Sequence, residues 1–197
     1  MTEQNERQDD RAGWGNWYYV FVFSIPVLVI GALILMGLLS SNVNPRRMGG
    51  SAGMFIGAAM PDLQAEAWIN GEQPTDDELK GKVVVVDAWA TWCRPCRMEA
   101  PHMVEMYHKY KDRGVVFIGL TSEGPAELKQ IRRFIDHFGI EWRNGYGAEG
   151  VLEKLGAEFI PQVWIFGPDG KLIWNVESSG PPEAGIEKAL AKLPSGS

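Results

Sequence analysis

The sequence predicts an α/β domain with a mixed sheet flanked by helices, preceded by one N-terminal transmembrane helix. Three observations lead to this prediction: a long apolar segment near the N-terminus, strand patterns that alternate with helical ones, and a Gly-Pro-Asp-Gly turn between the last two strand patterns. Alternating strands and helices indicate βαβ units, and a tight turn adds an antiparallel hairpin. We expect a tail over residues 1–16, a transmembrane helix over 17–39, a tether over 40–60 and one domain over 61–197.

The apolar segment has the length of a membrane span. No charged residue occurs between Arg11 and Arg46, and Trp17–Leu39 is almost entirely apolar. A bilayer core of about 30 Å needs about 20 helical residues. A cleaved signal peptide remains an alternative because small residues follow at Gly49–Gly53, although its basic start and short apolar stretch are not matched. The arginines on the two sides are equal in number, so they do not set the orientation.

Composition excludes several classes of protein. The chain has 197 residues and a formal charge of −6, from 19 basic and 25 acidic side chains. Nucleic-acid binding needs a basic surface, so we expect no nucleic-acid partner. Only two cysteines are present, which excludes a scaffold of several disulfides and a four-thiolate metal site.

The domain is predicted to begin with a strand, a helical turn and a central strand. Leu63–Asn70 has a short strand pattern that ends at an Asn-Gly turn. Thr75–Lys80 opens with a residue of helix-capping type followed by acids, which favours a brief helical turn. Val83–Ala90 is a continuous apolar run rich in β-branched residues, typical of a strand covered on both faces.

A long helix, a second buried strand and an amphipathic helix follow. The helical pattern runs from Arg94 to about Arg113, and Pro101 is expected to kink it. Val115–Leu120 is again a continuous apolar run, which predicts a buried strand. Pro125–Phe138 has apolar residues at helical spacing, and the glycine that follows is a helix stop signal.

The last part of the chain predicts a hairpin and a closing helix. Ile140–Arg143 has the pattern of a short strand and Gly150–Leu155 that of a short helix. Gln162–Phe166 and Lys171–Val176 lie on either side of the Gly-Pro-Asp-Gly turn, which predicts an antiparallel hairpin. Glu183–Lys192 is an amphipathic helical pattern.

The two cysteines, Cys93 and Cys96, lie where the central strand gives way to the long helix. The first amides and the positive dipole end of a helix favour an anion, which lowers the pKa of a thiol placed there. Two intervening residues let the second thiol close a disulfide ring, and Pro95 suits the first helical turn. Arg94 and Arg97 add positive charge nearby. The pattern predicts a redox-active pair in which Cys93 attacks a partner sulfur and Cys96 resolves the mixed disulfide.

Two other interpretations of this segment remain open. A passive disulfide would close too small a loop to stabilise the chain much. A copper(I) site would draw on soft side chains of the long helix, although methionines at helical spacing more often belong to a core. The candidate ligands are Met98, His102, Met103, Met106 and His108.

The segment VVVVDAWATWCRPCRMEAP resembles the active-site segment of the thioredoxin superfamily. It is most similar to the membrane-anchored thiol–disulfide oxidoreductases of the TlpA/ResA type, which are related to the alkyl hydroperoxide reductase and peroxiredoxin group. The resemblance covers about Ala58–Leu193 and implies a thioredoxin-like fold with a cis-proline loop beside the thiols. The residues that it implies for substrate contact are Trp92, Arg94, Pro95, Ile160 and Pro161.

Two acidic residues join the predicted site. Asp87 lies in the apolar strand, where a lone carboxylate is costly without a partner or a purpose. The resemblance implies that it relays the proton of Cys96, and burial should raise its pKa towards neutrality. An ion pair with Lys82 is the alternative. Glu99 matches the Glu-x-Pro pattern of the TlpA/ResA type, which implies that it tunes the thiols, and a solvated helix charge is the alternative.

Together these residues predict an enzyme, a membrane-tethered thiol–disulfide oxidoreductase that exchanges disulfides with protein substrates and needs no cofactor or metal. The expected catalytic residues are Cys93, Cys96, Asp87 and Glu99. The resemblance implies a single-pass protein with its domain on the periplasmic side, a membrane electron donor or acceptor, and apocytochrome c as a partner in cytochrome c maturation. Two other functions remain open: a peroxiredoxin-like peroxidase, although the residues before Cys93 lack that family's proline, and a copper- or haem-delivery module.

Overall fold

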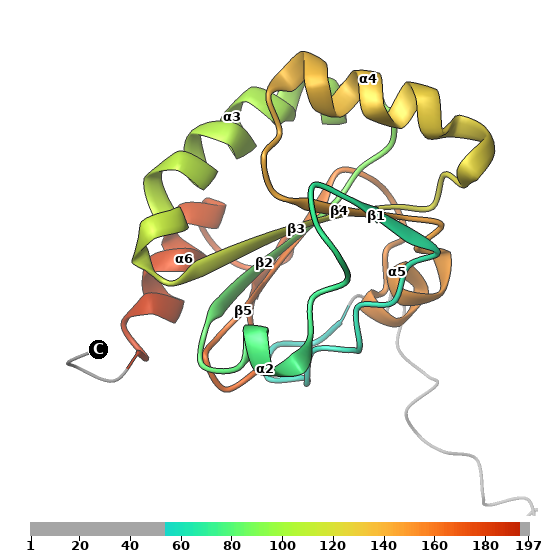
Figure 1. The fold of residues 1–197 in the computed structure, drawn as a ribbon. Helices are drawn as coiled ribbons and strands as arrows, with labels where there is room; N and C mark the ends of the chain where they lie inside the picture. Colours follow the sequence, from blue (N-terminus) through green and yellow to red (C-terminus); the bar gives the residue numbers. More distant parts are fainter. Residues whose placement is uncertain (1–53, 194–197) are drawn as a thin grey trace, which may run out of the picture. The chain divides into compact units, whose positions relative to one another are not determined.

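The computed structural model describes residues 54–193, which form a six-stranded mixed sheet with helices on both faces (Figure 1). The strands are β1 (Ala67–Ile69), β2 (Val83–Ala88), β3 (Val115–Thr121), β4 (Arg143–Tyr146), β5 (Gln162–Phe166) and β6 (Leu172–Asn175). Their order across the sheet is β1-β4-β3-β2-β5-β6. β2, β3 and β4 run parallel to one another, and β1, β5 and β6 run antiparallel to their neighbours. The predicted mixed sheet is confirmed.

The helices form two layers. They are α2 (Asp76–Leu79), α3 (Arg94–Tyr110), α4 (Leu128–Phe138), α5 (Glu149–Leu155) and α6 (Pro182–Leu190). One core cluster contains buried side chains of α3, α4 and α6 together with strand residues on one face of the sheet. A second cluster contains buried side chains of α2 and α5 together with strand residues on the other face. In Figure 1, α3 and α4 accordingly lie on the opposite side of the sheet from α2 and α5.

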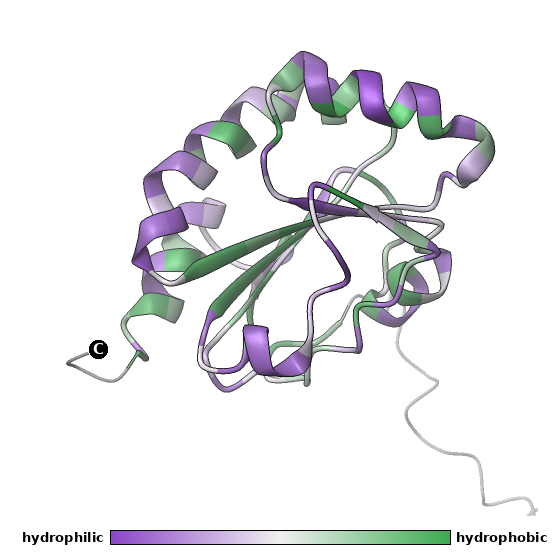
Figure 2. Ribbon diagram, viewed as in Figure 1, coloured by the Kyte–Doolittle hydropathy of each residue, from purple (hydrophilic) through white to green (hydrophobic). Residues whose placement is uncertain are grey.

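Strand β2 divides the two clusters. Val83 and Val85 belong to the cluster under α3, α4 and α6, whereas Val84 and Val86 belong to the cluster over α2 and α5. All six residues of β2 are buried. Figure 2 shows the central strands coloured as hydrophobic over most of their length. A strand covered on both faces needs such a run of apolar residues, so the central strand predicted from the sequence is confirmed.

Two strands differ from the prediction. β1 contains only the three residues that pair with β4, whereas the whole of Leu63–Asn70 was expected to be a strand. β4 begins at Arg143 and not at Ile140. Ile140 instead closes α4: its N–H donates to the Ile135 carbonyl at 3.0 Å, next to Gly139, whose left-handed φ of 67° ends the helix.

The helices and the hairpin follow the prediction more closely. Thr75 caps α2 in a reciprocal capping box with Glu78. α3 continues through Pro101 and is followed by the 3₁₀ turn Lys111–Arg113. β5 and β6 pair antiparallel around the Gly-Pro-Asp-Gly turn, as expected.

The predicted tail (1–16) and membrane span (17–39), with most of the predicted tether, lie outside the described residues. Within residues 54–193, none of the helices combines the length and the apolar character that a membrane crossing requires.

A close contact joins β3, β4 and the end of β2. Trp89 donates its indole N–H to the side-chain oxygen of Asn144 at 3.0 Å, and the Asn144 amide donates to the Trp142 carbonyl at 2.7 Å. Both side chains lie against Gly119, where an added Cβ would come within 1.9 Å of Asn144 Oδ1 and 2.9 Å of Trp89 Nε1. Any side chain at this position must therefore displace a buried hydrogen bond.

We expect Gly119→Ala to lower the free energy of unfolding by about 2 kcal/mol or more, through overpacking and the loss of that hydrogen bond. Denaturant unfolding measures the change. Gly150→Ala in α5 is the matched control, because no atom lies within 4 Å of an added Cβ there, and its free energy of unfolding should be unchanged or higher. A Gly119→Ala protein as stable as this control would contradict the packing described.

Candidate active site

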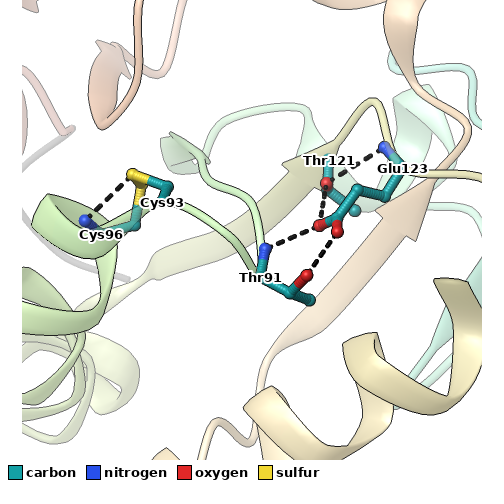
Figure 3. The surroundings of a disulfide bond; sticks show 5 residues. All are labelled: Thr91, Cys93, Cys96, Thr121 and Glu123. Atoms are coloured by element: carbon teal, nitrogen blue, oxygen red, sulfur yellow. Dashed lines mark hydrogen bonds between the residues drawn. A yellow bond between two sulfur atoms is a disulfide. The ribbon is translucent and has the colours of Figure 1, made fainter.

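The cysteine pair lies at the junction between β2 and α3. β2 ends at Ala88, and Cys93 is the N-cap residue of the 17-residue helix α3. The Cys93 sulfur accepts a hydrogen bond from the backbone N–H of Cys96 at 3.1 Å, and the two sulfurs form a disulfide bond (Figure 3). Pro95 lies in the first turn, where its missing N–H leaves no helical bond unmade. The predicted position of the first thiol, at the positive end of a helix, is confirmed.

Asp87 is buried in β2, six residues before the first cysteine. It is 8% exposed and pairs with Gly119 of β3 and Val163 of β5. Burial raises the pKa of Asp87 to about 7, and the negative charge of Glu99 adds to the rise. Lys82, the alternative partner, is exposed, and none of the ion pairs among residues 54–193 joins it to Asp87. Asp87 is thus a carboxyl group that exchanges its proton near neutral pH.

A small cavity brings the predicted residues together. It has room for about one water molecule, and its wall includes Asp87, Cys96, Glu99 and Pro161. The Ile160–Pro161 bond is cis, as the resemblance implied, and it lies directly before β5. Residues from β2, from α3 and from the loop before β5 therefore meet at one point behind the disulfide.

Glu99 is held by a histidine. His102, three residues further along α3, contacts the Glu99 carboxylate through Nδ1 at 2.6 Å and Glu183 of α6 through Nε2 at 2.8 Å. The hydrogen bond with Glu183, and next that with Glu99, raises the pKa of His102, and the contact lowers the pKa of Glu183. Glu99 thus has a partner on its own helix, while 42% of its side chain stays exposed to solvent. Sequence reasoning considered His102 only as a copper ligand and did not identify Glu183, because the contact spans 81 residues.

Three of the residues expected to contact substrates are exposed, and the two of the cis-proline loop are half-buried. They are Trp92, Arg94, Pro95, Ile160 and Pro161. Trp92 is 72% exposed, and it lines a groove of about 510 Å³ together with Phe159 and Ile160. Phe159 is 58% exposed and was not predicted; its one signal in the sequence was its place beside Ile160-Pro161.

A buried glutamate fixes the loop that leads to the first cysteine. Glu123, just after β3, accepts hydrogen bonds from the Thr91 N–H at 2.7 Å and from the Thr91 hydroxyl. Thr121 donates to the same carboxylate at 3.2 Å (Figure 3). Thr91 lies two residues before Cys93, so this carboxylate ties the end of β3 to the approach of the active-site loop. Sequence reasoning missed Glu123 because it lies two residues after β3 and not, like Asp87, inside an apolar strand.

The side chains considered for copper do not form one cluster. Met103 and Met106 are buried in the core, Met98 is exposed, and both ring nitrogens of His102 contact carboxylates. In the described part of the chain, no group of three or more His, Cys, Asp or Glu side chains is arranged to hold a metal ion.

Comparison with known proteins agrees with this geometry. The profile of the AhpC/TSA family matches residues 56–175, more than half of the chain. The chain belongs to the AhpC/TSA family. It is 27% identical to the thiol-disulfide oxidoreductase ResA of Bacillus cereus over 166 residues, which cover 84% of this chain and 94% of that protein. It is 31% identical to ResA of Halalkalibacterium halodurans over 123 residues, 62% of this chain and 68% of that protein.

Solved structures show the same fold. The thiol:disulfide interchange protein DsbE of Chlorobium tepidum matches with a TM-score of 0.59 and 25% identity, over 69% of this chain and 98% of that one. The predicted thioredoxin-like fold is confirmed, and the matched family with its ResA relatives and the Cys93–Cys96 pair identifies the chain as a thiol–disulfide oxidoreductase.

Asp87 should make the stability of the protein depend on pH. Its pKa is about 7 in the folded protein against an ordinary value of 3.8. The folded protein therefore holds an extra proton between these values, and its stability falls as the pH rises through that window. About three pKa units correspond to roughly 4 kcal/mol.

Asp87→Asn, which cannot ionise, should accordingly be more stable than the wild type by up to about 4 kcal/mol at pH 8. The difference should shrink steadily as the pH is lowered towards 4. Denaturant unfolding at a series of pH values measures it, with Asp136→Asn on the exposed face of α4 as the control. A stability difference that stays constant across this range would contradict the raised pKa.

Proposed function

We propose that this oxidoreductase exchanges disulfides with protein substrates through Cys93 and Cys96. Asp87 accepts the proton of Cys96, and Glu99 tunes the thiols. The observation that carries the proposal is the placement of Asp87 and Cys96 on one cavity, directly behind a disulfide at the N-terminus of α3. The helix end favours a thiolate on Cys93. A carboxyl with a pKa near 7 is suited to take the proton of Cys96.

In the reducing direction, the Cys93 thiolate attacks one sulfur of a substrate disulfide. A bond forms between Cys93 and that sulfur, and the other substrate sulfur leaves as a thiolate that takes a proton from water. Cys96 then gives its proton to Asp87 and attacks the Cys93 sulfur, which closes the Cys93–Cys96 disulfide and expels the second substrate sulfur. This sulfur takes the proton from Asp87. The substrate gains two electrons and two protons, and the same steps in reverse oxidise a dithiol.

The exposed rim around the pair supports docking of a protein segment. Cys93 and Cys96 are each only 3% exposed, so a substrate sulfur must reach them past the residues that border the disulfide. Trp92 is exposed and shares a groove with Ile160, and Pro161 lines the cavity beside Cys96. We propose that an extended substrate segment packs against these residues, with Arg94 and Pro95 beside it.

We further propose that the domain works on the extracytoplasmic, periplasmic side of a bacterial membrane, tethered by residues 17–39 and 40–60, where a membrane partner supplies or removes electrons. The apolar segment and the resemblance to membrane-anchored TlpA/ResA proteins support this placement. The same resemblance makes the cysteine pair of apocytochrome c the candidate substrate, in cytochrome c maturation.

Cys93→Ala should lower the rate of insulin disulfide reduction by at least about a hundredfold, because the attacking thiolate is lost. Cys96→Ala should instead accumulate an unresolved mixed disulfide, visible by mass spectrometry. His108→Asn, on an exposed position of α3, is the control and should behave as the wild type. Full activity of Cys93→Ala would overturn the proposal, and consumption of peroxide faster than disulfide exchange would favour a peroxidase.

Cys96→Ala expressed in a bacterial host should trap substrates as mixed disulfides in the membrane fraction. We expect the captured proteins to be extracytoplasmic, with apocytochrome c among them, and to be released by dithiothreitol. The double variant Cys93→Ala/Cys96→Ala is the control and should capture none. Capture of cytoplasmic proteins alone would show that the proposed orientation is wrong.

A further inference from the structure

His102 connects two helices through two carboxylates. Its Nδ1 lies 2.6 Å from Oε1 of Glu99 on α3, and its Nε2 lies 2.8 Å from Oε1 of Glu183 in the first turn of α6. A neutral imidazole has a hydrogen on only one nitrogen, so it can donate to only one of these acceptors. When both carboxylates are ionised, both contacts are satisfied together only by the imidazolium form. A positive charge therefore lies between Glu99 and Glu183.

Glu183 is a fixed anchor for this charge. It lies at the N-terminal end of α6, where a carboxylate is favoured. Its second oxygen, Oε2, is buried and has no hydrogen-bond partner among the described residues. The hydrogen bond with His102 is the largest of the effects that lower the pKa of this carboxylate. The charged groups that act on this pair are Glu99 on the same helix as His102 and, more weakly on Glu183, Lys109.

Glu99 faces the redox site as well as the histidine. It lines the cavity that also contains Asp87 and Cys96. Its negative charge helps to raise the pKa of Asp87, after the larger effect of burial. The imidazolium of His102 offsets the charge of Glu99, whereas a neutral side chain at position 102 would leave that charge to act on Asp87 in full.

We propose that His102 is a positioning residue which, anchored by Glu183, holds the Glu99 carboxylate at the cavity of Asp87 and Cys96 and offsets its charge, and so sets the pH range in which Cys96 resolves a mixed disulfide. The inference rests on the proposed function of Asp87 as the proton acceptor of Cys96. Without the positive charge of His102, Asp87 keeps its proton to higher pH, and resolution needs a higher pH as well.

The test is a stopped-flow reaction of the reduced full-length protein, in mild detergent, with 5,5′-dithiobis(2-nitrobenzoate). Attack by Cys93 releases one thionitrobenzoate and leaves the other bound to Cys93. Attack by Cys96 then releases the second. The rate of this second phase, followed from pH 5 to pH 9, should rise with the ionisation of Asp87.

His102→Asn keeps a hydrogen-bond donor for Glu99 but has no charge and does not reach Glu183. It should move the midpoint of the second phase upward by about 0.5 pH unit, which is a roughly threefold slower second phase on the rising part of the profile. Glu183→Gln, which removes the anchor charge and leaves His102 in place, should move the midpoint in the same direction by less. His108→Asn should not move it.

A double variant separates the proposed coupling from a general structural effect. In the Glu99→Gln background the addition of His102→Asn should leave the midpoint unchanged, because the charge that His102 offsets is gone. An unchanged or lowered midpoint in His102→Asn overturns the inference, as does a shift that persists in the Glu99→Gln background. A wild-type protein without a second phase would overturn the proposed function itself, and this inference with it.

Discussion

The burial of strand β2 is the constraint on which the rest of the structure depends. β2 lies between β3 and β5, with a core cluster on each face. Val83–Val86 stabilise the sheet because their apolar side chains are buried away from water on both of its faces. The same burial makes the carboxylate of Asp87 costly and moves its proton exchange to neutral pH. Because the end of this strand is fixed, the loop after it brings Cys93 to the N-terminus of α3.

The residues around the cavity belong to different elements that only the fold brings together. Asp87 comes from β2, Glu99 from α3 and Pro161 from the loop before β5, and all three line one cavity with Cys96. Glu123, which follows β3, holds the active-site loop from a further direction. Asp87 is the base that we propose for the thiol exchange, and the fold positions it beside Cys96 without any covalent link beyond the chain itself.

Elements with a strong local signal could be predicted, and those defined by distant partners could not. Val83–Ala88 is recognisable because a doubly covered strand must be apolar throughout. β4 was placed too early because Ile140 is as apolar as a strand residue, yet its N–H closes α4. For the site, Cys93 and Cys96 follow from spacing and position alone. The contact between His102 and Glu183 cannot be predicted from the local sequence, since 81 residues separate the two side chains.

The sequence by itself determined the chemistry of this protein: two thiols at a strand-to-helix junction, an acid inside an apolar strand, and the family to which that segment belongs. Each of these depends on residues close together in the chain, where periodicity and helix-end electrostatics act. Tertiary structure decided which side chains distant in the chain meet. It paired Glu99 with Glu183 through His102 and Thr91 with Glu123. Such contacts are set by the packing of α6 and β3 against the site, and electrostatic coupling depends on distance in space, not on separation in sequence.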